Sequence, residues 1–456
     1  MSDTQKLPQR GVYCHNSLKS AWCLRRFGGP NRRPNGSIDR PRSWRFDDRR
    51  IIEQGIEMNK SISFLLGTFG YSGGSMVLYG FMDRLCERGY KVYAISPQES
   101  LQWQSGLSRK IIDRFKHTRF RDSFRHSVAS LVRRSPVLEK AKRTLQNKVG
   151  KEPVERVQWI TNKLIENWIP TDITVSTYCT TAFAGYALSE RTLPLYYMQS
   201  YEELFFEDEL SRKIARLTYF LPLGLVANSK WLQTQVREIM GRDSSLLNPA
   251  IDTNIFRPHV DLGKKFRYDS NISIVSYYGQ AKLKNWDDAV EAMRMVFRKT
   301  SDRRVQWIVF GGVPPIVPDV PVKFVGRVFG EALARFYSSG HILFMNSWFE
   351  SFPLPPLEAM ACGTAVITIP VGTDDYALNH ENSLVVPSKS PGELAEAILK
   401  LIEDPKLASR LAESGIQTAR RFTWDKATDN MEAILEKELR SFRPNRFTDI
   451  FKLIHT

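Results

Sequence analysis

Residues 348–363, Trp-Phe-Glu-Ser-Phe-Pro-Leu-Pro-Pro-Leu-Glu-Ala-Met-Ala-Cys-Gly, decide the fold. Apolar runs at 341–345 and 365–369 flank this stretch and are expected to be strands. Pro355 or Pro356 suits the first position of a helix between them, where a missing N–H costs nothing, and Gly363 ends that helix. Strand, loop, helix and strand in this order form a βαβ unit, whose ligand lies at the carboxyl end of the first strand.

Two carboxylates frame the start of this helix. Glu350 is expected on the loop, and Glu358 in or near the first helical turn. Phe352 and Leu354 each precede a proline, so both are expected in extended backbone. A helix N-terminus favours an anion such as a phosphate, and flanking carboxylates can accept hydrogen bonds from sugar hydroxyls. The combination indicates a nucleotide-sugar, although a glutamate pair taken alone is more often helix capping and surface charge.

The segment Glu-Ser-Phe-Pro-x4-Glu-Ala-Met-Ala-Cys-Gly-Thr-Ala-Val-Ile resembles the signature of the retaining GT-B glycosyltransferases of the GT4 type, the glycosyl transferases group 1. Ala-Asn-Ser-x-Trp-Leu at 227–232 and Asn-x-x-Ile-Asp-Thr-x-x-Phe-x-Pro at 248–258 look like further signatures of that family. The resemblance covers residues 61–443 apart from a basic insertion. It implies an α/β protein of the GT-B class, with two Rossmann-like α/β/α domains facing across a cleft.

The domain organisation follows from the same pattern. We expect an N-terminal Rossmann-like acceptor domain at 58–257, a nucleotide-sugar domain at 258–415, and C-terminal helices at 416–456, the last of which crosses back onto the N-terminal domain in the resembled family. A basic extension at 1–57, rich in Arg, Pro, Gly and Asn, is expected to be disordered. One hypothesis is that this extension is not translated, because Met58 stands immediately before the first convincing strand.

The charge of the chain is concentrated in two segments. Residues 1–57 hold 12 Lys or Arg against 6 Asp or Glu, and residues 101–150 hold 13 against 3, whereas the rest is balanced. The second segment belongs to a basic, largely helical insertion at 101–166. A charge run is often a solvated face; the sharper interpretation is peripheral contact with anionic lipid headgroups. Nucleic-acid binding is not supported by any recognised module.

The cellular context is expected to be the cytoplasm or the cytoplasmic face of a membrane. The longest apolar run, near 217–227, is well short of the ~20 residues that span a bilayer. No signal-peptide pattern opens the chain. The five cysteines form no Cys-x-x-Cys pair, which indicates reduced thiols rather than a disulfide framework.

The resemblance also implies how a nucleoside-diphosphate sugar is held. Family members carry Gly-Arg and then Lys after the first strand of the second domain, but this chain has Gln280 where Arg is expected. Lys284, helped by Lys282, is therefore the expected phosphate cation, while Glu350 holds sugar hydroxyls and Glu358 the ribose hydroxyls. Glu350 and Lys284 form the expected catalytic pair. The expected donor-binding residues are Glu358, Lys282, Gln280, Gly279, Arg327, Ser351, Phe352, Leu354, Gly73 and Gly74.

Some of these residues have plainer interpretations. Gly73 and Gly74 can form a tight turn, and Arg327 can be a surface residue. The acceptor side is expected within 199–202, at Gln199, Tyr201 and Glu202, since the histidines at 117 and 126 lie in the basic insertion and not at a strand end.

No metal or cofactor is expected, because no Asp-x-Asp triplet occurs in the chain. Asp374 and Asp375 are expected to cap the helix that follows them.

The expected function is transfer of a sugar, with retention of anomeric configuration, to a glycan or lipid-linked acceptor in cell-surface polysaccharide or glycoconjugate synthesis. Three alternatives stay open. A glycoside hydrolase also uses two carboxylates, but they face one bond. A nucleotide-sugar epimerase shares the fold, and a catalytically silent scaffold is a real option because of Gln280.

Overall fold

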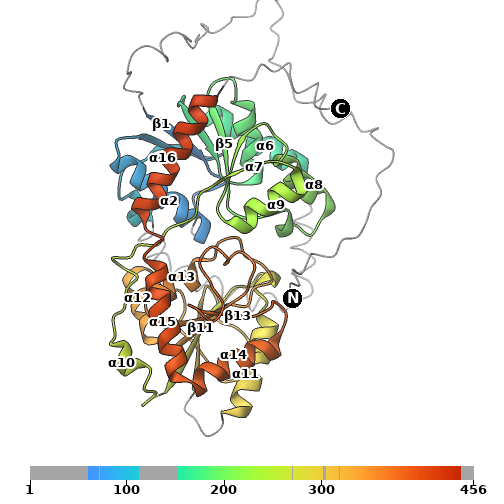
Figure 1. Ribbon diagram of the computed structural model, residues 1–456. Helices are drawn as coiled ribbons and strands as arrows, with labels where there is room; N and C mark the ends of the chain where they lie inside the picture. Colours follow the sequence, from blue (N-terminus) through green and yellow to red (C-terminus); the bar gives the residue numbers. More distant parts are fainter. Residues whose placement is uncertain are drawn as a thin grey trace, which may run out of the picture. The chain divides into compact units, whose positions relative to one another are not determined.

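The computed structural model describes residues 60–70, 72–111, 153–269, 271–300, 305–317 and 319–442. Residues 59–456 form one compact unit, which holds two α/β sheets with their helices (Figure 1). The basic extension, most of the basic insertion with both of its histidines, and the C-terminal tail lie outside the described residues. Across the described ranges, no helix combines the length and apolar character that crossing a membrane requires.

A seven-stranded sheet forms the centre of the N-terminal domain, in the order β3-β2-β1-β4-β5-β6-β7. Neighbouring strands are parallel except β2 and β3, which are antiparallel. The strands are β1 (Ser61–Leu65), β2 (Lys91–Ile95), β3 (Ser100–Gln102), β4 (Ile173–Ser176), β5 (Leu193–Met198), β6 (Gly224–Ala227) and β7 (Ser245–Leu246). The helical elements are α2 (Gly73–Glu87), α6 (Pro153–Asn167), α7 (Cys179–Ala187), η2 (Glu202–Phe205), α8 (Glu209–Thr218) and α9 (Lys230–Met240).

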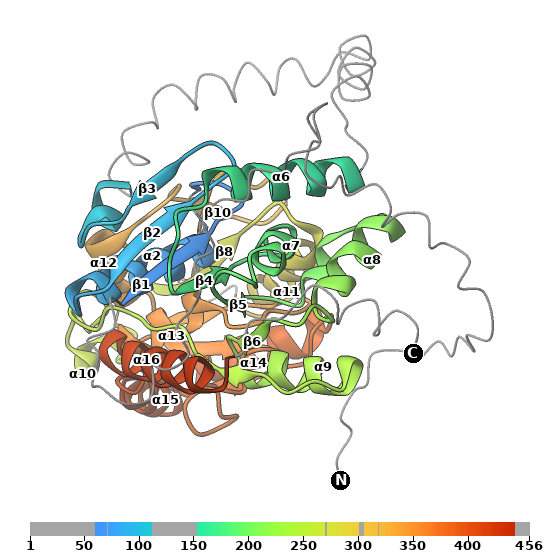
Figure 2. The ribbon, with the colours of Figure 1, turned by 90° about the horizontal axis from the view of Figure 1, so that it is seen from above.

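Both faces of this sheet are covered. Successive side chains of a strand point to opposite faces, so Ile62 and Phe64 join the core beside α2 and α16 (Trp424–Ser441), while Leu65 packs with α6 and α7. Figures 1 and 2 show α2 and α16 on one side of the sheet and α6 and α7 on the other. Double coverage explains why β5 reads as a continuous apolar run and why the Ser and Thr residues that alternate with apolar ones in β1 and β4, such as Ser63 and Thr174, are also buried.

The C-terminal domain has a six-stranded, wholly parallel sheet in the order β10-β9-β8-β11-β12-β13. Ile274 faces the layer that contains α11 and α14, and Val275 faces the layer that contains α12 and α13. The strands are β8 (Ile272–Tyr278), β9 (Val305–Gly311), β10 (Val322–Phe324), β11 (Ile342–Phe344), β12 (Ala365–Thr368) and β13 (Leu384–Val385). The helical elements are α10 (Leu262–Lys265), η3 (Lys282–Lys284), α11 (Trp286–Lys299), α12 (Gly330–Ser339), α13 (Leu354–Ala361), α14 (Pro391–Glu403) and α15 (Pro405–Ala419).

Each sheet has one point where the strand order reverses. In the N-terminal sheet the reversal lies between β1 and β4, and in the C-terminal sheet between β8 and β11. Ligands of doubly wound sheets bind in the crevice outside the carboxyl ends of the strands at such a point. A ligand-binding site is therefore expected at the loops that follow these four strands.

The last described helix, α16, belongs to the N-terminal domain although it follows the C-terminal domain in sequence. Figure 1 shows it beside α2. Its apolar face joins the core of the N-terminal domain, and the Arg88 guanidinium forms an ion pair with Asp429 at 2.7 Å. Gly80 of α2 leaves space for the Trp424 ring at the start of α16, because a Cβ there would lie 2.1 Å from the ring.

The expected pair of Rossmann-like α/β domains is confirmed, but two local predictions are wrong. Leu354 is the first residue of α13 and Pro353 is its N-cap, so the helix begins earlier than expected and Leu354 is not extended. Asp374 and Asp375 lie in a turn and cap no helix directly after them. The carboxylate of Asp375 instead accepts a hydrogen bond from the backbone N–H of Lys230, the first residue of α9 in the other domain.

We predict that Gly80→Ala destabilises the protein. The added methyl group meets the Trp424 ring, and overpacking of this kind lowers the free energy of unfolding by about 1–3 kcal/mol. Gly392→Ala in α14 is the matched control, because a Cβ there meets nothing within 4 Å; its effect should stay within about 0.5 kcal/mol. Urea unfolding of both variants measures the difference, and equal losses would show that α16 does not pack tightly on α2.

Candidate functional site

Two loops meet at the strand reversal of the C-terminal sheet. β8 and β11 are neighbouring parallel strands, so the loop after β8, which contains η3, and the loop after β11, which leads to α13, leave the same edge of the sheet. Asn285 and Asn346 join the loops: each side-chain amide donates to the other residue's backbone carbonyl, at 3.1 and 2.9 Å. Both side chains are buried, which makes these bonds costly to break.

The joined loops bring together the two residues expected to be catalytic. Lys284 Nζ lies 2.5 Å from Glu350 Oε1, and their side chains are 28% and 16% exposed. A partly shielded ion pair is stronger than one in open water, yet both groups remain accessible to a ligand. The arrangement offers a cation and a hydrogen-bond acceptor at one point on the carboxyl edge of the sheet.

The loop that carries Glu350 packs against the segment 372–376, which follows β12. Gly372 has φ +77°, and a Cβ there would lie 2.1 Å from the Glu350 carbonyl oxygen, so the backbones touch directly. The Tyr376 hydroxyl donates to the carbonyl of Pro353 at 2.7 Å, and its ring packs on Phe352. Ser351 and Phe352 are buried in this support, so any ligand contact through them uses the backbone.

Glu358 is the fifth residue of α13 and so lies just past the first helical turn, within the expected range. Its carboxyl accepts a hydrogen bond from the Tyr337 hydroxyl at 3.2 Å. Burial raises the pKa of Glu358 to about 7, because a low-dielectric surrounding disfavours the charged form. The buried surroundings therefore make this carboxyl easier to protonate than that of an exposed glutamate.

The other donor-side residues lie along the loop after β8 and near β10. Gly279 fits against the stem of Lys284, since a Cβ there would lie 3.1 Å from it. Gln280 is exposed, and Lys282 Nζ lies 5.7 Å from the centre of the Trp348 ring. Arg327 is exposed and its guanidinium lies beside Gly312. The structure thus brings Gly279 and Lys284 into contact.

The N-terminal domain presents its glycine loop at its own strand reversal. Gly73 and Gly74 form the first two residues of α2, after β1. A Cβ on Gly74 would lie 3.1 Å from the Gln199 side-chain oxygen. Gln199 itself is partly exposed, and its carbonyl accepts a hydrogen bond from Asn228 at 2.9 Å. The structure therefore places a donor-side glycine and an expected acceptor-side residue together.

Tyr201 and Glu202, in contrast, point into the domain. Tyr201 is buried and stacks on Tyr219, and Glu202 is 1% exposed. The Glu202 carboxylate accepts hydrogen bonds from the backbone N–H of Cys179 and from the Tyr196 hydroxyl, and burial raises its pKa to about 7. The Glu202 contacts cap the start of α7, and both side chains point into the domain. The prediction that Tyr201 and Glu202 contact the acceptor directly is therefore wrong.

Four polar contacts link the Glu350 loop and the turn at 371–376 to the N-terminal domain. The Ser351 hydroxyl donates to Asn228 and lies 3.3 Å from the hydroxyl of Ser229, the N-cap of α9. Asp375 accepts from the Lys230 backbone N–H and from the Asn248 amide, each at 3.0 Å. Burial raises the pKa of Asp375.

These contacts correspond to residues that sequence reasoning left out of the site. Asn228 and Ser229 stand in the Ala-Asn-Ser-x-Trp-Leu segment, where their position at the end of a predicted strand was the available signal. No sequence pattern indicated that Asp375 binds the start of a distant helix.

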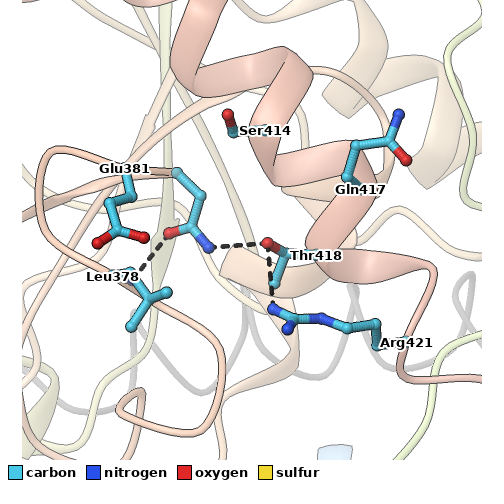
Figure 3. Close-up of a pocket in the computed structure, with 7 residues that line it drawn as sticks. Leu378, Glu381, Ser414, Gln417, Thr418 and Arg421 are labelled. Atoms are coloured by element: carbon cyan, nitrogen blue, oxygen red, sulfur yellow. Dashed lines mark hydrogen bonds between the residues drawn. The ribbon is translucent and has the colours of Figure 1, made fainter.

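A depression of about 390 Å³ lies elsewhere, on α15 and the turn after residue 377 (Figure 3). Asn382 and Arg421 both donate to the Thr418 hydroxyl there, at 2.8 and 3.5 Å. Three of its lining side chains are thus bonded to one another, and none of the expected site residues lines it. It is therefore not the candidate site.

The described residues hold no group of three or more His, Cys, Asp or Glu that could bind a metal ion. The expectation of a metal-free site stays a prediction.

Two doubly wound α/β sheets, each with one strand reversal, are consistent with the fold of the GT-B glycosyltransferases. Sucrose-phosphate synthase from Thermosynechococcus elongatus aligns with 84% of this chain and 100% of its own, at 18% identity and a TM-score of 0.62. The Anabaena protein HepE, solved in complex with UDP-glucose, aligns with 83% of this chain and 99% of its own, at 15% identity and a TM-score of 0.58. These likenesses support the fold alone.

Residues 271–404 match the family model of the glycosyl transferases group 1, which confirms the family resemblance recognised in the sequence. A D-inositol 3-phosphate glycosyltransferase from Streptomyces bingchenggensis is 36% identical over 128 residues, 28% of each chain. A second, from Catenulispora acidiphila, is 25% identical over 254 residues, 50% of this chain and 58% of the relative. The chain thus spans 28% to 58% of the length of these curated relatives, which are named glycosyltransferases, in line with the expected enzyme class.

We predict that Glu358→Gln changes the pH dependence of stability. The folded protein holds the Glu358 proton more tightly than the unfolded chain, so ionisation weakens the wild-type fold as pH rises from 4.5 towards 7. A glutamine cannot ionise, and the variant should gain about 1–3 kcal/mol relative to the wild type between acidic and mildly alkaline pH.

Urea unfolding across this pH range measures the gain. Glu403→Gln, at an exposed position of α14, is the control and should follow the wild-type profile. Parallel profiles for Glu358→Gln and the wild type would contradict the assigned burial effect.

Proposed function

We propose that this protein is a retaining glycosyltransferase that moves a sugar from a nucleoside-diphosphate sugar to a glycan or lipid-linked acceptor. The observation that carries the proposal is the Lys284–Glu350 pair at the strand reversal of the C-terminal sheet. A cation for a diphosphate and a carboxylate for sugar hydroxyls stand there side by side, at the edge where doubly wound sheets bind ligands. The match of this domain to a glycosyltransferase family supports it.

The donor is held by side chains on one side and backbone on the other. Lys284 binds the diphosphate, and Glu350 accepts hydrogen bonds from the sugar. The N-terminal end of α13 adds positive potential, but Pro353, Pro355 and Pro356 have no N–H to donate. Backbone donation in this segment is therefore limited to Ser351, Phe352 and Leu354.

The ribose of the donor lies against Glu358. Burial raises the pKa of this carboxyl to about 7, and a ribose hydroxyl that donates to it favours the charged form and lowers that pKa on binding. HepE was solved in complex with UDP-glucose, which supports a nucleoside-diphosphate sugar as the class of donor. Arg327, exposed after β10, lies on the side of the nucleotide base.

The chemistry is charge stabilisation. Cleavage at the anomeric carbon leaves positive charge on the sugar ring and negative charge on the diphosphate. Lys284 and the start of α13 stabilise the diphosphate as it departs, and fixed charges of this kind need little rearrangement during the reaction. Retention of configuration follows if the acceptor approaches on the face that the diphosphate leaves.

The proposal also includes the acceptor and the cellular location of the reaction. The relatives are named D-inositol 3-phosphate glycosyltransferases, which supports a polyhydroxylated acceptor. We place the reaction in cell-surface polysaccharide or glycoconjugate synthesis, in the cytoplasm, with the basic segment 101–150 resting on anionic lipid.

Incubation with radiolabelled UDP-, GDP- and dTDP-sugars and a membrane extract tests the proposal. Label in lipid or glycan supports transfer. An isomerised donor indicates an epimerase, release of free sugar from glycan indicates a hydrolase, and absence of both turnover and binding indicates a scaffold.

We predict that Glu350→Gln and Lys284→Ala each lower transfer by about 100-fold or more, the usual loss when one preorganised charge is removed from a reacting centre. Lys400→Ala, at an exposed position of α14, should leave the rate unchanged. Circular dichroism and thermal unfolding verify that the variants fold. Full activity in folded Lys284→Ala would remove this lysine from the mechanism.

We predict that Gln280→Arg strengthens donor binding. The exposed Gln280 follows Gly279 at the end of β8, where the resembled family has arginine, and a second cation adds a charge-assisted hydrogen bond to the diphosphate. The dissociation constant of the nucleoside diphosphate, measured by calorimetry, should fall up to about tenfold. Gln280→Leu is the control for the loss of the amide, and weaker binding by the arginine variant would show that the loop cannot direct this side chain to the phosphates.

A further inference from the structure

Three aromatic rings from both domains form a row beside Glu350. Phe349 directly precedes Glu350 and stacks on Phe205 of η2 and on Trp231 of α9, with 6.3 Å between ring centres in each pair. The interplanar angles are 27° and 30°, so each outer ring is tilted only moderately from the plane of the Phe349 ring. We call these three residues the aromatic row.

The row is only partly explained by packing between the domains. Phe205 is 44% exposed, and Trp231 and Phe349 are only partly buried. The two domains are already linked nearby by the polar contacts of Ser351 and Asp375. Exposed aromatic surface next to a charged site is typical of a ligand-binding wall, because solvent-facing rings gain free energy when a ligand covers them.

The path of the chain explains why Phe205 stands here. Tyr201 and Glu202 are anchored inside the N-terminal domain, and η2 then turns outward to present Leu204 and Phe205. Phe205 therefore presents an exposed ring three residues after the segment 199–202 that was expected on the acceptor side.

We propose that the aromatic row binds the apolar face of a ring-shaped polyol acceptor, a sugar or a cyclitol. Such a ring has C–H groups on its faces and hydroxyls around its rim. Its faces gain dispersion and hydrophobic free energy on aromatic rings, while its rim hydroxyls reach the polar groups around Glu350. The inference rests on the proposed transfer reaction and names the class of its acceptor.

Two other roles of the row predict different behaviour. If the rings only hold the domains together, removing Phe205 changes stability but no ligand affinity. If the row binds the alkyl chain of a lipid-linked acceptor, glycosides with long alkyl chains bind and those with methyl groups do not. If the row binds the sugar ring, methyl glycosides bind as well, and removing Phe205 weakens their binding.

Saturation-transfer NMR on the full chain tests the proposal. The probes are the methyl glycosides of glucose, galactose, mannose and rhamnose, together with myo-inositol and octyl β-glucoside below its micelle concentration. We expect at least one methyl glycoside or myo-inositol to receive saturation at its ring C–H protons. Phe205→Ala should weaken that binding about tenfold, the scale of lost aromatic stacking.

Phe220→Ala is the matched control, because Phe220 is 52% exposed on the same domain and belongs outside the row; it should bind the probe like the wild type. Thermal unfolding verifies that both variants fold. Absence of ring contact in all probes, saturation confined to the octyl chain, or unchanged affinity in Phe205→Ala overturns the proposal.

Calorimetry with UDP and GDP separates this proposal from the proposed function. Phe205→Ala should bind the nucleotide as the wild type does. Glycoside binding without nucleotide binding would overturn the transferase proposal and leave the row, whereas nucleotide binding without glycoside binding would overturn the row alone.

Discussion

The reciprocal hydrogen bonds between Asn285 and Asn346 are the interaction on which the site depends. Asn285 has φ +54°, a conformation that asparagine tolerates better than most residues. This turn lets its amide reach the loop after β11 while the next residue, Trp286, begins α11. Because the two loops are fixed by buried bonds, Lys284 and Glu350 are positioned before a ligand arrives, which reduces the reorganisation that binding requires.

The support of the Glu350 loop extends into the other domain. Gly372 lies against the loop's backbone, and Ser351 binds Asn228 at the end of β6. Asp375 occupies the N-terminal end of α9, where free N–H groups and the helix dipole favour a carboxylate. The candidate site is therefore built on parts that are fixed by polar contacts within one compact unit.

Much of this arrangement is readable from the sequence. Short apolar runs that alternate with helical segments predict buried parallel strands. The two glutamates, with the prolines between them, predict a ligand-binding loop before a helix. The sequence predicts less well the direction in which individual side chains point. Tyr201 and Glu202 follow a strand, like many ligand-binding residues. Local sequence cannot tell that Tyr201 stacks on Tyr219, or that Glu202 accepts a hydrogen bond from Cys179, inside the domain. The partners of Asp375 and Phe349 are more than 100 residues away, so only the folded chain reveals them.

The position of α16 has a consequence for how the chain folds during synthesis. Its buried face, contributed by Ala427, Met431, Ile434 and Leu435, completes the core of the N-terminal domain. The ribosome releases this helix only after the entire second domain has emerged. Until then, the apolar surface of the first domain beside α2 stays exposed to solvent. Nascent chains with such a gap are prone to association and depend on chaperones. Proteolytic trimming from the C-terminal end would reopen the same surface, and the first domain would lose its cover although the cut lies at the opposite end of the polypeptide.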